Sequence, residues 1–363
     1  MNLTDGELAL APLGAGDLID RAVRLYRRHF LTLIRIAAPP VLVSALGSTF
    51  TTIAIREIGV TGSSARLLLY VLMILGGSLV IIAGSLFSLI VMGGATRNLV
   101  AHLLSGEAVS FRTTYRAVKS RFWGLFAASL LVGAWLIFAG WLAFMGFYLV
   151  FAVLMIAAFA FASVLPAWII AIFTGLTTIA AIILGLILFF LLAGRMAYVP
   201  QAMLVEGRGV TSAIGRSFSL ASGNVRRLMA MTMFTSFATY SALMLLMVPL
   251  GWYGWLNGVD INPFGATWPA WYAIGYEVVL QCSHILLAPI WMLGLSLLYV
   301  DERVRHEGYD IELSAARNLP PLPELPGVMS PFAPALVTRR AAKFVPPPIA
   351  AMPPPSVLGL SNR

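Results

Sequence analysis

Three polar residues interrupt the last long apolar stretch of this 363-residue chain. Glu277, Gln281 and His284 are spaced i, i+4 and i+7, which places their side chains on one face of an α-helix. A carboxylate, an amide and an imidazole on one face are groups that line proton or substrate paths inside membranes. The same groups also join neighbouring helices through hydrogen bonds. The pattern therefore leaves two interpretations open, a path through the membrane and an interhelical contact.

The sequence shows none of the short motifs that mark common catalytic sites. It contains no phosphate-binding loop, no Gly-x-Ser-x-Gly nucleophile turn and no His-Glu-x-x-His zinc motif. Its four histidines are far apart, and its only cysteine, Cys282, cannot form an intrachain disulfide. We therefore expect a protein that is not an enzyme and that holds no metal and no cofactor.

The composition indicates that the helices that position these residues lie in a lipid bilayer. Hydrophobic residues make up 60% of the chain and charged residues only 11%, whereas soluble domains are about half apolar and a quarter charged. These values exclude a soluble enzyme and a disordered chain. Apolar runs of tens of residues argue against a β-barrel. The sequence predicts an all-α fold, a polytopic transmembrane helical bundle.

About six segments are long and apolar enough to cross a bilayer core of about 30 Å. The predicted spans are residues 30–56, 67–96, 122–146, 176–202, 228–252 and 272–300. The 73 uncharged residues between Arg121 and Arg195 have room for three crossings. The extra apolar segment 147–173, broken by Pro166 and Gly175, is predicted to form a re-entrant or outer-leaflet hairpin. Two additional spans there are the alternative.

The distribution of basic residues predicts the orientation of the spans. With six spans, 22 of the 24 lysines and arginines lie on one side, and only Arg56 and Arg66 lie on the other. Basic loops stay in the cytoplasm, so we expect both termini to be cytoplasmic. A net charge of +9 would suggest nucleic-acid binding in a soluble protein. In a membrane protein it indicates orientation, and we expect no nucleic-acid partner.

A basic amphipathic segment precedes each odd-numbered span. These segments are residues 17–30, 115–123 and 215–229, and each combines arginines with an apolar helical face. They predict interfacial helices on the cytoplasmic side, in contact with anionic lipid headgroups. Three repeated units, each a basic helix followed by a transmembrane hairpin, would explain the pattern. A general need for basic helices at the cytoplasmic ends of spans would explain it equally well.

The chain divides into three predicted regions. Residues 1–16 form an N-terminal cytoplasmic segment, and residues 17–312 form the membrane domain. Residues 313–363 form a proline-rich, disordered cytoplasmic tail. The tail contains Arg339, Arg340 and Lys343, so we expect it to contact the anionic membrane surface or a cytoplasmic protein partner.

Three motifs in order carry a resemblance to a known family. They are LGAGDLIDRAVRLYRRHFLTLI near the start, VPQAMLVEGRGVTSAIGRSFSLASGNVRRL in the middle and LLYVDERVRHEGYDIEL after the last span. Together they resemble the glycerophosphoryl diester phosphodiesterase membrane-domain family. The resemblance implies a multi-pass protein of the bacterial cytoplasmic (inner) membrane. It does not imply the phosphodiesterase reaction, because the family name describes a membrane module that can accompany a separate catalytic domain.

Three functional hypotheses follow from the sequence, and one of them, a membrane-embedded hydrolase, lacks a nucleophile and a base at recognisable spacing. The first is a non-catalytic membrane scaffold or accessory subunit with a membrane or cytoplasmic protein partner. The alternative is a transporter or lipid-handling permease that uses Glu277, Gln281 and His284. Directly after the last span, the charged run from Asp301 to Arg305 is predicted to pair internally or with the basic helices and to hold the cytoplasmic end of the bundle together.

Overall fold

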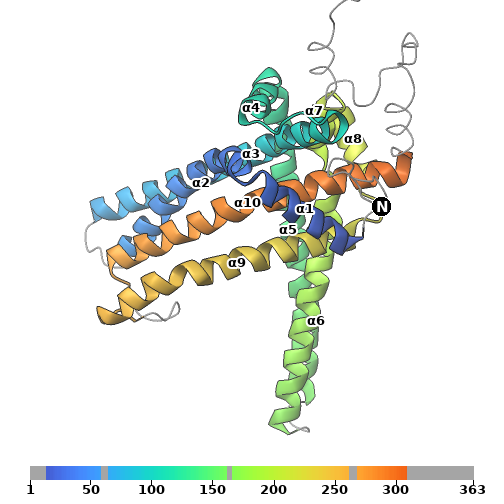
Figure 1. The fold of residues 1–363 in the computed structure, drawn as a ribbon. Coiled ribbons are helices and arrows are strands. Elements are labelled where there is room, and N and C mark those ends of the chain that lie inside the picture. The colour runs from blue at the N-terminus through green and yellow to red at the C-terminus, as the bar shows by residue number, and fades with distance from the viewer. Residues whose placement is uncertain (1–13, 59–63, 162–165, 261–267, 309–363) are drawn as a thin grey trace, which may run out of the picture.

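The computed structural model describes residues 14–58, 64–161, 166–260 and 268–308, and every regular element in these ranges is helical (Figure 1). The predicted N-terminal segment, apart from its last three residues, and the predicted tail lie outside the described residues. The long helices are α2 (Phe30–Ile58), α3 (Ser64–Ser105), α5 (Phe122–Phe161), α6 (Ala167–Ala193), α9 (Val225–Leu256) and α10 (Ala270–Glu307). The short elements are α1 (Ala15–Arg28), α4 (Phe111–Ser120), η1 (Gly194–Met196), α7 (Val199–Val205) and α8 (Val210–Leu220).

The six long helices account for the predicted crossings. Each is long and apolar enough to span a membrane, α6 continuing through η1 and α7 in one apolar stretch. They pack as three hairpins, α2 with α3, α5 with α6 and α9 with α10. The all-α fold class and the multi-pass character are thereby confirmed. A short helix precedes each hairpin, namely α1, α4 and α8.

The apolar faces of the three short helices pack against protein. Leu18 and Ala22 of α1 are buried, and the Tyr26 hydroxyl donates to the carbonyl of Leu286 on α10 at 2.6 Å. In α4, Val118 is buried beside Gly94 of α3. Amphipathic periodicity alone does not say whether an apolar face meets lipid or protein. If these helices contact a membrane surface, they do so through their charged faces, because their apolar faces contact protein.

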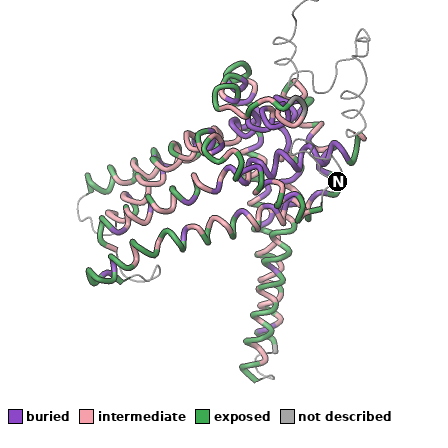
Figure 2. Tube along the Cα trace, viewed as in Figure 1, coloured by how far each residue is buried: buried purple, intermediate pink, exposed green. Residues whose placement is uncertain are grey.

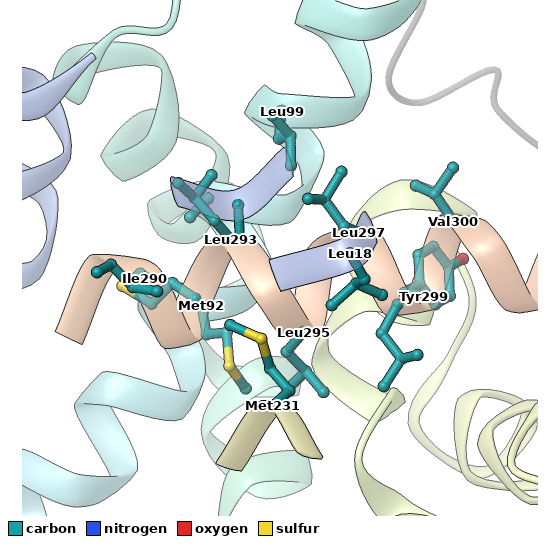
Figure 3. Close-up of a cluster of buried hydrophobic side chains, with 14 of the residues drawn as sticks. Leu18, Met92, Leu99, Met231, Ile290, Leu293, Leu295, Leu297, Tyr299 and Val300 are labelled. Atoms are coloured by element: carbon teal, nitrogen blue, oxygen red, sulfur yellow. The ribbon is translucent and has the colours of Figure 1, made fainter. Parts of the chain in front are cut away.

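The hydrophobic core lies where the short helices meet the inner half of α10. Every residue from Met292 to Val304 is buried, and buried residues concentrate in this part of the molecule (Figure 2). Leu18 of α1, Met92 and Leu99 of α3 and Met231 of α9 surround this stretch of α10 (Figure 3). We call this region, formed by α1, α4, α7, α8 and the adjoining ends of the long helices, the base.

The α5–α6 hairpin leaves the base in a direction different from the other four long helices (Figure 1). Leu125, Ala128 and Val132, in the first turns of α5, are buried against α7 and neighbouring helices. Farther out, small residues mark the contact of α5 with α6: Ala139 and Ala181 are fully buried. Small side chains let two membrane helices approach closely. The hairpin is thus a two-helix arm attached to the base at one end.

The structure corrects the expected hairpin at 147–173. Residues 147–161 continue α5 without interruption, and residues 167–173 open α6, so the described residues of this segment extend two long helices. Its centre, 162–165, lies outside the described residues. Neither a separate re-entrant hairpin nor two extra spans is present in the described part of the segment. Of the two expected breaks, Pro166 lies at the N-cap before α6, whereas Gly175 lies inside α6 and does not interrupt it, because a single glycine is tolerated within a helix.

Candidate functional sites along helix alpha10

Glu277 is the centre of a polar cluster near the end of α10 that is remote from the base. The Ser48 hydroxyl of α2 donates to Glu277 Oε1, and Gln281 Nε2 donates to the same oxygen at 2.8 Å. Gln281 Nε2 also lies 3.0 Å from Ser48 Oγ. Only 6% of Glu277 is exposed. The three side chains form a closed triangle that joins α2 to α10, and we call it the Glu277 cluster.

His284, the third residue of the predicted stripe, does not join this cluster. It is exposed, and so is Cys282. On another side of α10, Ser283 is buried and donates to the carbonyl of Thr239 on α9 at 2.7 Å. Helices cross at an angle, so residues on one face of a helix do not all meet the same neighbour. The structure thus brings together Glu277 and Gln281 and separates His284 from them.

A cavity of about 350 Å³ adjoins the Glu277 cluster between the ends of α2, α3 and α10. Glu277 lines it, together with Thr49, Thr52, Ile53, Arg56, Glu57, Tyr70, Met73, Ala270, Ala273 and Ile274. Its size falls in the range of small-molecule sites, about 300–1,000 Å³. The walls combine hydroxyl groups, apolar side chains and one buried carboxylate. We call it the outer cavity.

Close helix packing accounts for where this cavity ends. A Cβ atom added at Gly47 of α2 would lie 2.5 Å from the carbonyl oxygen of Gly77 on α3, so the two backbones touch at this level. The cavity begins just beyond this contact, at Thr49 of α2, and the small side chains of Ala270 and Ala273 leave space for it on α10. The glycine contact and the Glu277 cluster therefore close the cavity toward the base.

The other end of α10 carries a buried group of ion pairs. Arg227 of α9 pairs with both Asp301 and Glu302, whose side chains are 1% and 0% exposed. Arg305 also reaches Asp301, at 2.8 Å. Charges this deeply buried are tolerated only when they are paired. We call these residues, together with Glu206, Arg208, Arg216, Arg303 and Glu307, the inner ion cluster.

Glu206, which follows α7, ties α8 to α10 within this cluster. Arg216 Nε of α8 lies 3.1 Å from both of its carboxylate oxygens, and the Tyr299 hydroxyl donates to Oε1 at 2.7 Å. Arg208 Nε donates to Oε2 at 2.6 Å, and Arg303 Nε lies 3.8 Å from Oε1. The side chain of Glu206 is 2% exposed. Four partners on one buried carboxylate make it the hub of the cluster.

The charges around Glu206 set its protonation. Burial raises the pKa of the carboxyl group, but the nearby Arg303, the Tyr299 hydrogen bond, Arg208 and Arg216 outweigh burial and hold it below the usual value. The pKa of Arg216 shifts upward for the converse reason, because Glu206 and Glu307 outweigh the lowering effect of burial. Both groups are therefore charged at neutral pH.

The expected pairing at the end of the last span is present, and its partners come from α7–α9. The run Asp301–Arg305 pairs internally through Asp301 and Arg305, and with Arg227 from the third basic segment. The sequence does not predict the central position of Glu206, and it does not predict that Ser48 binds Glu277. Neither carries a local signal, since Ser48 is 229 residues from Glu277 and Glu206 is 93 residues from Tyr299.

The fold and these two clusters define an all-α, multi-pass membrane protein with polar groups at both ends of its central helix. Among the described residues, no group of three or more histidine, cysteine, aspartate or glutamate side chains is placed to hold a metal ion. Neither a family model nor a curated protein nor a solved structure matches the chain.

Proposed function

We propose that this protein is a non-catalytic membrane scaffold or accessory subunit whose α5–α6 arm binds another membrane protein. The observation that carries the proposal is the arm itself. Its attachment involves the first turns of α5 and the end of α6, as the burial of Leu125 and Phe190 shows. Beyond that point, large apolar side chains are exposed, among them Ile137, Trp141, Phe144, Tyr148, Ile156, Leu176 and Ile183.

The length of the arm supports a partner in addition to lipid. The 40 residues of α5 extend about 60 Å at about 1.5 Å per residue, twice the bilayer core of about 30 Å. Two helices of this length, which lack further support among the described residues, gain van der Waals contacts from helices of a partner. Helices α5 and α6 contain no charged residue, and an arm of this kind that is attached at one end is suited to that role.

Site-specific photo-crosslinking in native membranes tests the scaffold proposal. A photoreactive amino acid replaces Ile137 on the arm, and Leu245 on α9 serves as the control, since both side chains are more than 70% exposed. We expect a discrete protein adduct at Ile137 and lipid adducts at Leu245. Lipid adducts alone at both positions, or the same protein adducts at both, would contradict the proposal.

We further propose that the base faces the cytoplasm of a bacterial cell, as the basic residues and the family resemblance imply. The proposal is supported by two cavities beside α4. One, of about 550 Å³, is lined by Arg35 and Arg112, and the other, of about 230 Å³, by Arg97 and Arg116 together with one acid, Glu107. The two arginines that line each cavity suit anionic lipid headgroups, because each cation near an anionic membrane surface contributes about 1 kcal/mol.

Cysteine labelling tests this orientation. In a Cys282→Ser background, Ser219→Cys places a thiol on the exposed side of α8, and Asn257→Cys places one at the exposed end of α9. A membrane-impermeant maleimide should label position 257 in intact cells and position 219 only after permeabilisation. The reverse order of labelling would overturn the orientation.

The alternative function, a transporter or lipid-handling permease, has one observation in its favour. Glu277 is a buried acid at membrane depth and lines the outer cavity. A permease would carry a small molecule that binds in the outer cavity across the membrane of a proteoliposome. A scaffold would bind the same molecule without net uptake. Measuring uptake of a radiolabelled ligand by wild-type protein and by Glu277→Gln separates the two functions.

A further inference from the structure

The Glu277 carboxylate has one oxygen occupied and one available. Both donors, Ser48 Oγ and Gln281 Nε2, reach Oε1. The structure gives Oε2 no hydrogen-bond partner among the described residues, and the side chain lines the outer cavity. An ionised carboxylate offers about four acceptor positions. A 94% buried carboxylate that leaves half of them unused is arranged to receive a donor from the cavity.

The walls of the outer cavity narrow the choice of donor. Thr52 and Tyr70 supply hydroxyl groups, and Ile53, Met73 and Ile274 supply apolar surface. A volume of about 350 Å³ is about ten times the share of one water molecule, about 30 Å³, so the space exceeds what a bare metal ion fills. The cavity therefore fits an organic group that carries both a donor and an apolar part.

The chemistry of the site favours a primary ammonium over a quaternary one. A primary ammonium has three N–H donors, which Glu277 Oε2 and neighbouring hydroxyls can accept. Quaternary ammonium groups are recognised by cages of several aromatic rings, and Tyr70 is the single aromatic residue among those that line this cavity. The acid and base at the rim, Arg56 and Glu57, already neutralise each other at 3.2 Å, which leaves Glu277 to attract the cation.

We propose that the outer cavity binds the primary ammonium group of a small amphiphilic amine, with Glu277 as its counter-ion. The amine is either a free organic amine or the headgroup of an amine-bearing lipid, because both present the same –NH₃⁺ group. The Ser48 and Gln281 hydrogen bonds orient the carboxylate so that Oε2 faces the ligand. This inference does not rest on the scaffold role, since arm crosslinking and amine binding are separate measurements.

The test uses the full chain in nanodiscs of phosphatidylcholine, with n-butylammonium as the probe. Its thermal unfolding temperature should rise with n-butylammonium concentration and reach a plateau, whereas n-butanol, which has the same chain and no charge, should cause no shift. Glu277→Gln keeps the shape and the Oε1 acceptor, and it should weaken apparent binding at least tenfold. Asp260→Asn is the matched control, because it removes an exposed acid that does not line the outer cavity and should leave binding within twofold.

A second variant keeps the proposal testable if Glu277→Gln unfolds. Ala273→Leu fills the outer cavity from α10 and leaves the Glu277 cluster intact, so it should also abolish the n-butylammonium shift. Undiminished binding in both Glu277→Gln and Ala273→Leu, equal loss in Asp260→Asn and Glu277→Gln, or no shift in the wild-type protein with either n-butylammonium or an amine-bearing lipid would overturn the proposal.

Nanodiscs that contain phosphatidylethanolamine distinguish the two sources of the amine. If the ligand is a lipid headgroup, phosphatidylethanolamine raises the unfolding temperature of the wild-type protein, has no such effect on Glu277→Gln and competes with n-butylammonium. If the ligand is a free amine, n-butylammonium shifts the unfolding temperature equally in both lipids.

Discussion

The two ends of α10 handle buried charge in opposite ways. At the inner end, Asp301, Glu302 and Glu206 each pair with an arginine of α8, α9 or α10, although Glu302 Oε2 has no hydrogen-bond partner among the described residues. At the outer end, Glu277 has two neutral donors on one oxygen and a cavity beside the other. Arginine partners compensate the buried carboxylates of the inner end, whereas a buried carboxylate held only by neutral donors can still bind a cation. The same helix thus combines a structural end and an end suited to a ligand.

The largest expected effect comes from removing Arg227. Arg227→Leu leaves Asp301 and Glu302 buried without this partner, and the loss of one partner from a buried ion pair costs about 3–5 kcal/mol. Unfolding in nanodiscs or detergent would measure the loss. The adjacent exposed arginine supplies the control: Arg226→Leu should change the free energy of unfolding by at most about 0.5 kcal/mol. Equal effects of both variants would mean that the inner ion cluster does not stabilise the fold.

A smaller and pH-dependent effect is expected at Glu206. Its pKa in the folded protein lies below the ordinary value of 4.5, so its stabilising contribution is present above that value and is lost as the pH falls through the folded pKa. The wild-type protein should therefore be more stable than Glu206→Gln at pH 7, and the difference should shrink below about pH 4.5. Unfolding temperatures of both proteins from pH 3 to pH 8 provide the measurement. A difference that grows on acidification would contradict the assigned pairing.

The smallest expected effect concerns the helix contact that closes the outer cavity. In Gly77→Ala, the new methyl group would lie 2.7 Å from the Gly47 carbonyl oxygen, so α2 and α3 must move apart at a cost of about 1–3 kcal/mol. Gly76→Ala is the control, because no atom lies within 4 Å of its added Cβ. Comparing the unfolding free energies of the two variants tests the contact. Similar stabilities would show that the glycines do not hold α2 and α3 together.

The sequence predicted the number of long helices but not their full lengths. Hydropathy predicted a span at 272–300, whereas α10 runs from Ala270 to Glu307, because its charged end is buried by protein and continues as a helix. The predicted span 122–146 became the 40-residue α5. Hydropathy measures preference for lipid, and it does not register where a helix continues into a folded base or along a partner helix.

The candidate site was predicted as far as local spacing allowed. The i, i+4 spacing correctly placed Glu277 beside Gln281, whereas Ser48 and the cavity depend on how α2 and α3 meet α10. His284 lies on the same face of α10 as Glu277 and Gln281, but it is exposed and does not contact Ser48 of α2. The resemblance to the phosphodiesterase membrane-domain family, the membrane of residence and the partner stay predictions.

The most direct test of the division of roles along α10 is thermal unfolding of two conservative variants in phosphatidylcholine nanodiscs, with and without n-butylammonium. Arg227→Lys removes the guanidinium whose two nitrogens reach Asp301 and Glu302, and Glu277→Gln neutralises the acid at the outer end. We predict that Arg227→Lys unfolds at a lower temperature and keeps the amine-dependent rise, while Glu277→Gln unfolds close to the wild-type temperature and loses it. Loss of the rise in Arg227→Lys together with its retention in Glu277→Gln would contradict the account.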